Sequence, residues 1–195
     1  MDEQEVARLI EEQIAYYRAR AAEYDEWFMR RGRYDHGPEL NRQWFHEVEA
    51  VARALAEFRP AGRLLELACG TGWWTEHLAR YSDDVTAVDA SPEAIALNRQ
   101  RLGGRPVRYV EADLFAWEPD REYDVVFFSF WLSHVPPERF EPFWSLVRRC
   151  LAPGGRVFLI DSRPDPTSTA RDQRFSPPDD PTMIRRLNDG RAFRI

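Results

Sequence analysis

The sequence Arg63-Leu-Leu-Glu-Leu-Ala-Cys-Gly-Thr-Gly72 decides the fold class of this 195-residue chain. Its leucines form a nearly continuous apolar run, which is typical of a strand covered on both faces. The two glycines that close the stretch, Gly70 and Gly72, let the backbone turn sharply and let a ligand approach it closely. The stretch therefore predicts a buried strand that runs into a binding loop, and a nucleotide-like ligand is the first hypothesis.

The third position after Gly72 distinguishes two kinds of nucleotide-binding loop. A dinucleotide-binding loop has another glycine there, so that the helix packs closely and offers its N-terminus to a pyrophosphate. This chain has Thr75 at that position, which disfavours a nucleoside- or flavin-linked oxidoreductase and leaves it as the alternative enzyme class. The remaining pattern, Glu66-x-x-x-Gly70-x-Gly72, resembles motif I of the class I S-adenosylmethionine-dependent methyltransferases, whose cofactor carries no phosphate.

Two more carboxylates follow the next two predicted strands. Asp89 ends the apolar run of residues 85–88, where a carboxylate can accept hydrogen bonds from ribose hydroxyls. Asp113 ends the following strand, and in methyltransferases of this type an aspartate there accepts from the adenine amino group. Open α/β sheets bind ligands at the carboxyl ends of their strands, so the order of the acids supports the resemblance. Either aspartate taken singly could instead begin a turn or cap a helix.

The resemblance implies a set of cofactor-binding residues in the glycine loop, after the second and third strands, at the end of the fourth strand and in the first helix. These residues are Glu66, Ala68, Gly70, Gly72, Trp73, Asp89, Ala90, Asp113, Leu114, Ser129 and Tyr17. Core packing is the alternative for Tyr17 and for Trp73. The implied cofactor is S-adenosyl-L-methionine, with S-adenosyl-L-homocysteine as its product, and no metal ion is implied.

Apolar periodicity predicts the elements around the loop. Residues 6–28 and 38–58 carry apolar side chains at spacings of three and four, which predicts two amphipathic helices before the sheet. Strands and helices then alternate from residue 61 to residue 161. This alternation predicts a doubly wound α/β fold with a mostly parallel sheet and right-handed crossovers.

We expect a single methyltransferase domain in residues 1–195. Its parts are an N-terminal helical cap at 1–60, a cofactor-binding core at 61–161, a proline-rich loop at 162–181 and a C-terminal hairpin at 182–195. Methyltransferases of this type add a helix and a last antiparallel strand, so the resemblance implies that this chain is truncated and lacks the last strand. The fifth strand, at 156–161, would then present a bare edge that could pair two copies in a homodimer.

The segment Ser129-Phe-Trp-Leu-Ser-His-Val-Pro136 follows the fourth predicted strand and faces the transferred methyl group in the family that the chain resembles. It lacks the Asn-Pro-Pro-Tyr signature of enzymes that methylate base amines, and it is similar to the Leu-x-His-Val-Pro loop of methyltransferases that act on small metabolites. His134 is therefore the candidate catalytic base, because imidazole titrates near neutral pH. The alternatives for His134 are a cap of the proline turn or a wall of the cofactor pocket. The competing bases are Asp161 and a tyrosine of the first helix.

The composition limits which binding partners and which cellular compartment we expect for this protein. A formal charge of -6 weighs against a nucleic-acid substrate, so we expect a small-molecule methyl acceptor. No apolar run approaches the roughly 18 residues of a spanning helix, and the N-terminus is not the basic start of a signal peptide. We therefore expect no membrane partner and a cytoplasmic location. Cys69 and Cys150 lack metal-like spacing, and we expect both to be reduced thiols.

The sequence thus predicts an enzyme that transfers a methyl group from S-adenosylmethionine to a small molecule. O-methylation is favoured over N-methylation. An aromatic content of 13% favours an apolar or aromatic hydroxyl compound over a strongly anionic acceptor. The alternative is a methyltransferase-like module that binds S-adenosylmethionine, or a partner, without catalysis.

Overall fold

A computed structural model gives the fold of the chain and describes residues 1–162, 167, 169–173 and 184–194. The chain divides into two compact units. Unit 1 comprises Met1–Glu49 and Ser162–Ile195, and unit 2 comprises Ala50–Asp161. Most of the predicted proline-rich loop at 162–181 lies outside the described residues.

Unit 2 is built on a five-stranded parallel sheet flanked by helices. Its strands are β1 (Leu64–Leu67), β2 (Val85–Asp89), β3 (Val107–Glu111), β4 (Tyr123–Ser129) and β5 (Leu151–Ile160), and they lie in the order β3-β2-β1-β4-β5. Its helices are the end of α2 (Pro38–Phe58), α3 (Trp73–Leu78), α4 (Pro92–Leu102) and α5 (Phe140–Cys150), with single turns η2 (Leu132–His134) and η3 (Pro137–Arg139). All neighbouring strands are parallel. The predicted doubly wound α/β fold is confirmed.

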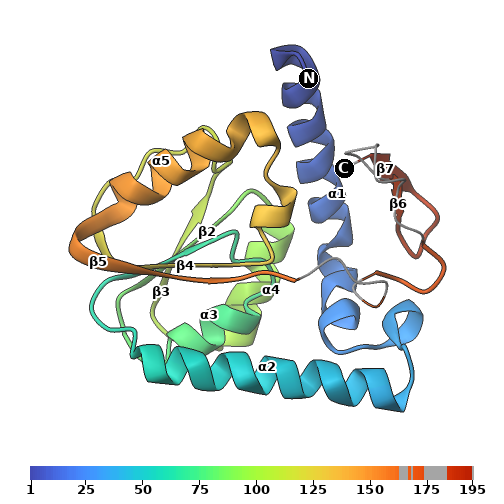
Figure 1. The fold of residues 1–195 in the computed structure, drawn as a ribbon, viewed down its shortest axis with the longest axis horizontal. Helices are drawn as coiled ribbons and strands as arrows, with labels where there is room; N and C mark the ends of the chain where they lie inside the picture. Colours follow the sequence, from blue (N-terminus) through green and yellow to red (C-terminus); the bar gives the residue numbers. More distant parts are fainter. Residues whose placement is uncertain (163–166, 168, 174–183, 195) are drawn as a thin grey trace. The chain divides into compact units, whose positions relative to one another are not determined.

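Right-handed crossovers place helices on both faces of this sheet. The chain moves from β1 to β2 and on to β3 in one direction, so α3 and α4 cover the same face (Figure 1). It then returns past β1 to β4 and β5, so α5 covers the opposite face. Residues 112–122 make the return from β3 to β4 without a helix. The strand order therefore reverses between β1 and β4, and sheets of this kind bind ligands beyond the carboxyl ends of the strands at that point.

The central strand β1 is buried on both faces because its side chains alternate between two hydrophobic clusters. Leu64 packs in the cluster that contains Trp74 and Leu78 of α3. Leu65 and Leu67 pack in the other cluster, which contains the buried face of α5. Each fully buried leucine stabilises the fold by about 1.5–3 kcal/mol relative to an exposed one. The apolar run before the glycine loop therefore fixes the middle of the sheet.

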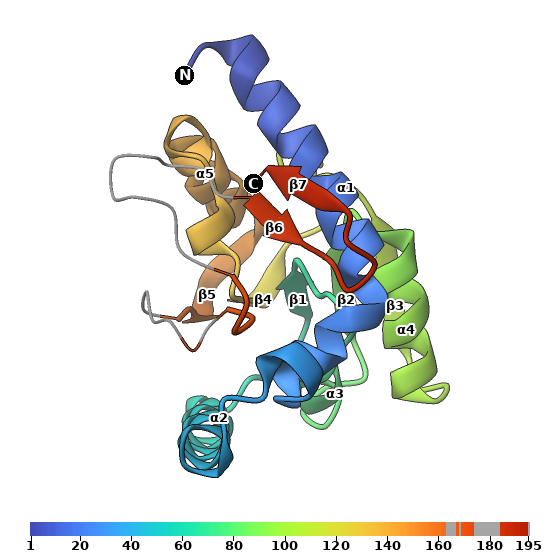
Figure 2. The same cartoon turned by 90° about the vertical axis from the view of Figure 1, so that its right-hand side faces the viewer.

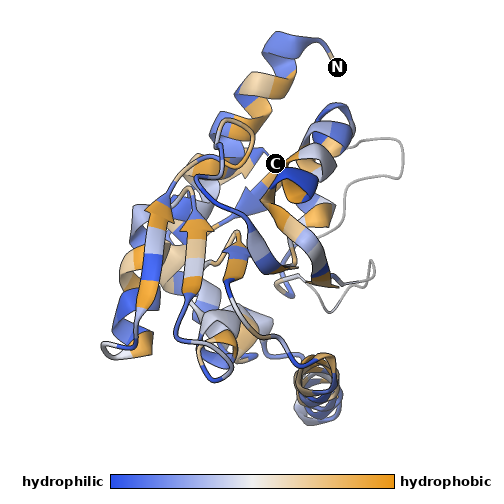
Figure 3. Cartoon of the chain, turned by 90° about the vertical axis from the view of Figure 1, so that its left-hand side faces the viewer, coloured by the Kyte–Doolittle hydropathy of each residue, from blue (hydrophilic) through white to orange (hydrophobic). Residues whose placement is uncertain are grey.

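Unit 1 combines a long helix with a hairpin. It consists of α1 (Glu3–Phe28), η1 (Gly32–Tyr34), the start of α2, and the antiparallel strands β6 (Ile184–Arg186) and β7 (Ala192–Arg194). Strand β7 packs against α1 (Figure 2). Asp2 and Glu5 form a capping box at the start of α1, because each carboxylate accepts the backbone N–H of the other residue. Apolar and polar bands alternate along α1, as its amphipathic pattern predicts (Figure 3).

The bounds of β5 and the end of β3 differ from the sequence-based expectation. Strand β5 begins at Leu151 rather than residue 156, because Leu151 already pairs with Tyr123 before the glycine turn. Pairing resumes after a register shift, with Arg156 opposite Val125. Strand β3 ends at Glu111, so Asp113 lies in the turn beyond the strand rather than at its last residue.

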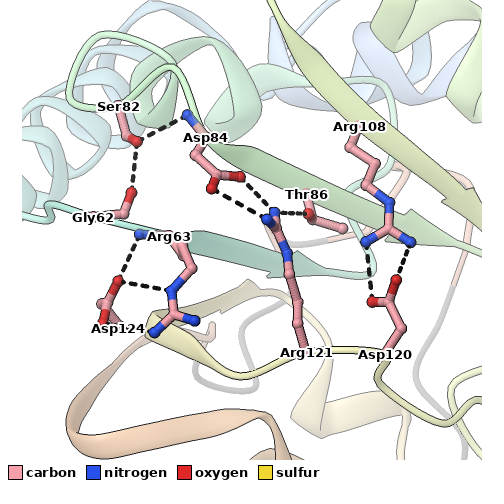
Figure 4. A network of polar contacts seen from close by, with 9 residues as sticks. All are labelled: Gly62, Arg63, Ser82, Asp84, Thr86, Arg108, Asp120, Arg121 and Asp124. Carbon is pink, nitrogen blue, oxygen red and sulfur yellow. Dashed lines mark hydrogen bonds and ion pairs between the residues drawn. The ribbon is translucent and has the colours of Figure 1, made fainter.

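Arginine–aspartate pairs connect the loops at the amino ends of the strands (Figure 4). The pairs are Arg63–Asp124, Arg121–Asp84 and Arg108–Asp120. Asp124 also accepts the backbone N–H of Arg63 at 2.7 Å, and this joins the start of β4 to the start of β1. The paired side chains are 31% to 56% exposed, so solvent screens them and they contribute little stability. They order the edge of the sheet opposite the glycine loop.

Candidate active site

The glycine loop joins β1 to α3 through alternating left-handed residues. Ala68, Gly70 and Gly72 have φ values of 53°, 52° and 91°. The backbone N–H of Cys69 donates to the carbonyl of Val88 at 3.0 Å, so the loop still follows β2 as it turns. Ala68 is the one residue of the three with a side chain, and a left-handed conformation costs such a residue about 1–2 kcal/mol.

The two glycines of the loop serve different purposes. A Cβ at Gly70 would meet nothing within 4 Å, so the backbone there borders open space. A Cβ at Gly72 would lie 2.5 Å from the side-chain oxygen of Asn98. Gly70 therefore leaves room for a ligand, and Gly72 leaves room for Asn98.

A buried polar network supports the loop from below. Glu66 is 1% exposed, and the Thr75 hydroxyl donates to its carboxyl at 2.5 Å. The Asn98 amide donates to the Thr75 hydroxyl at 2.8 Å and to the carbonyl of Gly70 at 3.3 Å. The Tyr109 hydroxyl in turn donates to the Asn98 side-chain oxygen at 2.8 Å. The network therefore links β1, α3, α4 and β3 to the glycine loop.

Burial dominates the electrostatics of Glu66. It raises the pKa of Glu66 to about 8, although the hydrogen bond from Thr75 lowers it, and the nearby Asp89 carboxylate raises it further. Glu66 is therefore mostly protonated at neutral pH. The hydrogen-bond network that supports the glycine loop thus contains a neutral carboxylic acid. A direct contact between Glu66 and a cofactor stays a prediction.

Asp89 joins the glycine loop to the turn after β2. One of its carboxylate oxygens accepts the N–H of Gly70 at 2.8 Å, and the other accepts the N–H of Ser91 at 2.9 Å. Burial raises the pKa of Asp89, and these backbone hydrogen bonds oppose that change. The backbone N–H of Ala90 also lowers the pKa of Asp89. A carboxylate has about four acceptor positions, so Asp89 keeps an acceptor position for a ligand hydroxyl. The half-buried Ala90 follows directly.

Asp113 caps the turn after β3. Its carboxylate accepts the N–H of Phe115 at 2.9 Å, which is the turn-forming role considered as an alternative for this residue. Leu114 is buried in the cluster beneath α5. The N–H of Ala112 donates to the carbonyl of Asp89 at 2.9 Å, so this turn adjoins the end of β2. Recognition of adenine by Asp113 stays a prediction.

Trp73 is held against α4 by an arginine. The guanidinium carbon of Arg101 lies 3.9 Å from the centroid of the Trp73 ring. The Arg101 Nε–H also donates to the carbonyl of Thr71 at 2.9 Å. Arg101 therefore contacts both the glycine loop, at Thr71, and the first residue of α3, Trp73.

The loop after β4 is tied to the end of β5. Asp161 accepts from the backbone N–H of Ser133 at 3.0 Å and from its hydroxyl at 3.1 Å. Ser129 ends β4, and the half-buried His134 ends η2 within this loop. Asp161, a competing candidate base, therefore positions the segment that contains His134.

Tyr17 belongs to the other unit. It lies on α1 of unit 1, and its ring packs edge-on against Tyr16 with a centroid distance of 4.9 Å. Its predicted contact with a cofactor stays a prediction. The other predicted cofactor residues lie in unit 2, on the loop and turns at the carboxyl ends of β1 to β4 or, for Glu66 and Trp73, directly beside the loop.

The sequence-based prediction missed the two α4 residues that hold the loop, Asn98 and Arg101. A signal for Asn98 was present, because it falls in the buried stripe of α4 formed by Ala94, Ile95 and Leu102. A polar residue at such a position requires hydrogen-bond partners. No comparable pattern pointed to Arg101.

The described part of the chain offers neither a metal-binding group nor a membrane span. No cluster of three or more histidine, cysteine or carboxylate side chains suited to a metal ion occurs among the described residues. None of the described helices is both long enough and apolar enough to cross a bilayer.

The parallel sheet, its glycine loop and the carboxylates at its edge define an α/β protein of the nucleotide-binding type. Residues 64–155 match the methyltransferase domain family. The chain is 41% identical to DhpI, solved in complex with SAH, with a TM-score of 0.74 over 95% of this chain and 78% of DhpI. DhpI has also been solved in a complex with SAM and HEP. The chain belongs to the S-adenosylmethionine-dependent methyltransferases, and the resemblance seen in motif I is confirmed.

Curated relatives match over shorter stretches. An uncharacterized methyltransferase, sll0829, of Synechocystis sp. (strain ATCC 27184 / PCC 6803 / Kazusa) is 33% identical over 120 residues, which are 60% of this chain and 53% of the relative. A ubiquinone biosynthesis O-methyltransferase of Xanthomonas axonopodis pv. citri (strain 306) is 32% identical over 123 residues, 59% of this chain and 49% of the relative. The chain spans about half the length of these curated relatives.

The substitution Glu66→Gln should change how stability depends on pH. The pKa of Glu66 is about 8 in the folded chain and 4.5 for a free glutamate, so between these values the folded state holds a proton that the unfolded state releases. The wild-type free energy of unfolding therefore falls as pH rises through this range, by at most about 1.4 kcal/mol per pH unit. The variant lacks this decline, so its stability relative to the wild type rises from about pH 4.5 and levels off above about pH 8.

Urea unfolding at several pH values measures the effect. Glu111→Gln removes an exposed carboxyl at the end of β3 and serves as the control. If Glu66→Gln and Glu111→Gln show the same pH dependence as the wild type, Glu66 is not the protonated support of the loop.

Proposed function

We propose that this protein transfers a methyl group from S-adenosylmethionine to a small-molecule acceptor. The observation that best supports this proposal is the glycine loop at the point where the strand order reverses. The backbone of Gly70 borders open space there, and the carboxylate of Asp89 accepts the N–H of Gly70. The complexes of DhpI with SAH and with SAM support the same cofactor here.

Residues at the carboxyl ends of the unit 2 strands would hold the cofactor. In this proposal Asp89 accepts from the ribose hydroxyls and Asp113 from the adenine amino group. Trp73, Ala90, Leu114 and Ser129 form the surrounding wall, and Glu66, Ala68 and Gly72 shape the loop. The cofactor supplies a methyl group that is already electrophilic on its sulfonium. The chain's contribution is to orient the acceptor and exclude water, so proximity is the main catalytic effect.

O-methylation is the favoured reaction. The loop after β4 lacks the Asn-Pro-Pro-Tyr signature of enzymes that methylate base amines, and one curated relative is named as an O-methyltransferase. The ligand named HEP in the DhpI complex is a natural first acceptor to test. Methyl transfer from radiolabelled cofactor to a panel of hydroxyl and amine compounds decides between the two reactions. Tight cofactor binding without transfer to any of them would favour the binding-module alternative.

Asp89→Ala should lower the affinity for S-adenosylmethionine at least about tenfold, because each hydrogen bond to a carboxylate contributes about 1.5–3 kcal/mol. Asp113→Ala should have a milder effect, since it accepts from one neutral group. Calorimetric titration with S-adenosylmethionine, S-adenosylhomocysteine and NAD measures both effects and tests the oxidoreductase alternative. Asp83→Ala, at an exposed position before β2, is the control. Unchanged affinity in Asp89→Ala would remove Asp89 from the site, and a larger loss in Asp113→Ala would reverse the two roles.

His134 is the proposed general base, placed in the loop that Asp161 holds through Ser133. His134→Ala should lower kcat by on the order of 10² to 10⁴-fold and leave cofactor affinity within a few fold. The acidic limb of the pH–rate profile should disappear, because a protonated imidazole cannot accept the acceptor's proton. His46→Ala, at an exposed position on α2, is the control. Loss of cofactor binding in step with rate would instead identify His134 as a wall of the pocket.

A homodimer through β5 completes the proposal. Among the described residues, β4 is the only strand that pairs with β5. The carbonyl of Ile160 accepts from Phe130 beside β4, so the backbone groups of the preceding residue, Leu159, point to the outer edge. Leu159→Pro should therefore give a monomer in sedimentation velocity without unfolding, because it removes an outward N–H. Leu159→Ala keeps that N–H and should remain dimeric. A wild-type chain that sediments as a monomer contradicts the proposed dimer.

A further inference from the structure

The backbone of Gly70 is held from two sides. Its N–H donates to the carboxylate of Asp89 at 2.8 Å, and its carbonyl accepts from the side-chain amide of Asn98 at 3.3 Å. Gly70 has a φ of 52°, and glycine loses more conformational freedom on folding than any other residue. The two hydrogen bonds therefore select one backbone conformation at the point where the loop borders open space.

Asn98 holds the carbonyl of Gly70 only while its amino group is turned toward the loop. That carbonyl is purely an acceptor. The Thr75 hydroxyl gives its one proton to Glu66, so it must accept from Asn98 as well. Both N–H groups of the amide are thus used on one side. Asn98 is 0% exposed, so its side-chain oxygen on the other side requires a donor from within the protein.

The hydroxyl of Tyr109 is that donor. Tyr109 lies on β3, which packs against α4, and its hydroxyl donates to the Asn98 oxygen at 2.8 Å (Figure 2). The guanidinium carbon of Arg99, the next residue of α4, lies 4.3 Å from the centroid of the Tyr109 ring. Burial raises the pKa of Tyr109, so the hydroxyl keeps its proton at neutral pH. The ring face and the hydroxyl of Tyr109 therefore both contact α4 beside the loop.

The hydrogen bonds in this chain of groups run in one direction, from Tyr109 through Asn98 to the glycine loop. Loss of the Tyr109 hydroxyl would remove a donor from a buried oxygen, and such an oxygen favours any conformation that gives it a new partner. A rotated amide would place that oxygen against the carbonyl of Gly70, which offers no proton. The loop would then have to be ordered when a ligand binds, and that ordering lowers affinity.

We propose that Tyr109 is a positioning residue for the cofactor site, and that it acts through Asn98 by keeping the Gly70 backbone in its binding conformation. This role requires no contact between Tyr109 and the cofactor. The effect on affinity rests on the proposed cofactor site, whereas the effect on the loop is measured without cofactor.

Calorimetric titration with S-adenosylmethionine measures the effect on affinity. Tyr109→Phe keeps the ring and its contact with Arg99 and removes only the hydroxyl, so it should weaken binding about fivefold or more. Tyr81→Phe removes a hydroxyl from an exposed ring just after α3 and should stay within about twofold of the wild type. Unchanged affinity in Tyr109→Phe overturns the proposal.

A double-mutant cycle shows whether Tyr109 acts through Asn98. Asn98→Ala should weaken binding on the order of tenfold, and adding Tyr109→Phe to it should change the affinity by less than about twofold. Two losses that multiply would show that Tyr109 does not act through Asn98. If Asn98→Ala does not fold, Asn98→Ser takes its place in the cycle. Leu102→Val shortens a buried side chain at the end of α4, and as the control for lost stability it should keep affinity within about twofold.

Amide hydrogen exchange followed by NMR gives a measurement without cofactor. The N–H of Gly70 should exchange at least about fivefold faster in Tyr109→Phe than in the wild type or Tyr81→Phe. A general loss of stability would also speed exchange of the core strand amides, so a faster rate confined to the loop identifies a loosened loop. Unchanged exchange at Gly70 in Tyr109→Phe overturns the proposal. A wild type that binds no S-adenosylmethionine refutes the proposed cofactor site, and exchange at Gly70 then decides the role of Tyr109.

Discussion

The hydrogen bond from Thr75 to the buried carboxyl of Glu66 is the contact on which the binding edge of the sheet depends. Alternation along β1 turns Glu66 toward α3, into an apolar layer where an unsatisfied polar group would cost about 1–3 kcal/mol. Asn98 extends the bond to the backbone of Gly70. Threonine at the position of a dinucleotide loop's third glycine therefore has two effects. Its side chain fills the space that a third glycine leaves open for close helix packing in dinucleotide-binding loops. It also supports the glycine loop of this chain.

Carboxylates hold the loops at this edge by accepting backbone N–H groups. Asp89 holds the glycine loop, Asp113 closes the next turn and Asp161 holds the loop after β4. These bonds fix the backbone before any ligand arrives, which lowers the entropic cost of orienting reactants. They also explain how the loop tolerates Ala68 in a left-handed conformation, since strain of about 1–3 kcal/mol persists where surrounding contacts determine the backbone.

The chain contains no lysine, and the structure uses the planar group of arginine against aromatic rings. Arg30 lies 3.9 Å from the centroid of Trp44 in unit 1, and Arg101 lies at the same distance from Trp73 in unit 2. Each also donates to a backbone carbonyl, so one side chain joins a ring to a loop. Lysine, a compact ammonium, could not stack and donate in this way.

The sequence by itself determined the fold and the order of the binding loops. Apolar runs, glycine positions and proline caps are local signals, so they predicted the alternating strands and helices. The acids in or just after successive strands predicted the class of cofactor. Only the tertiary structure decided that Asn98 anchors the glycine loop and that Asp113 caps a turn. It also decided the division into two units. These features depend on burial and on contacts between residues far apart along the chain, which local spacing does not specify.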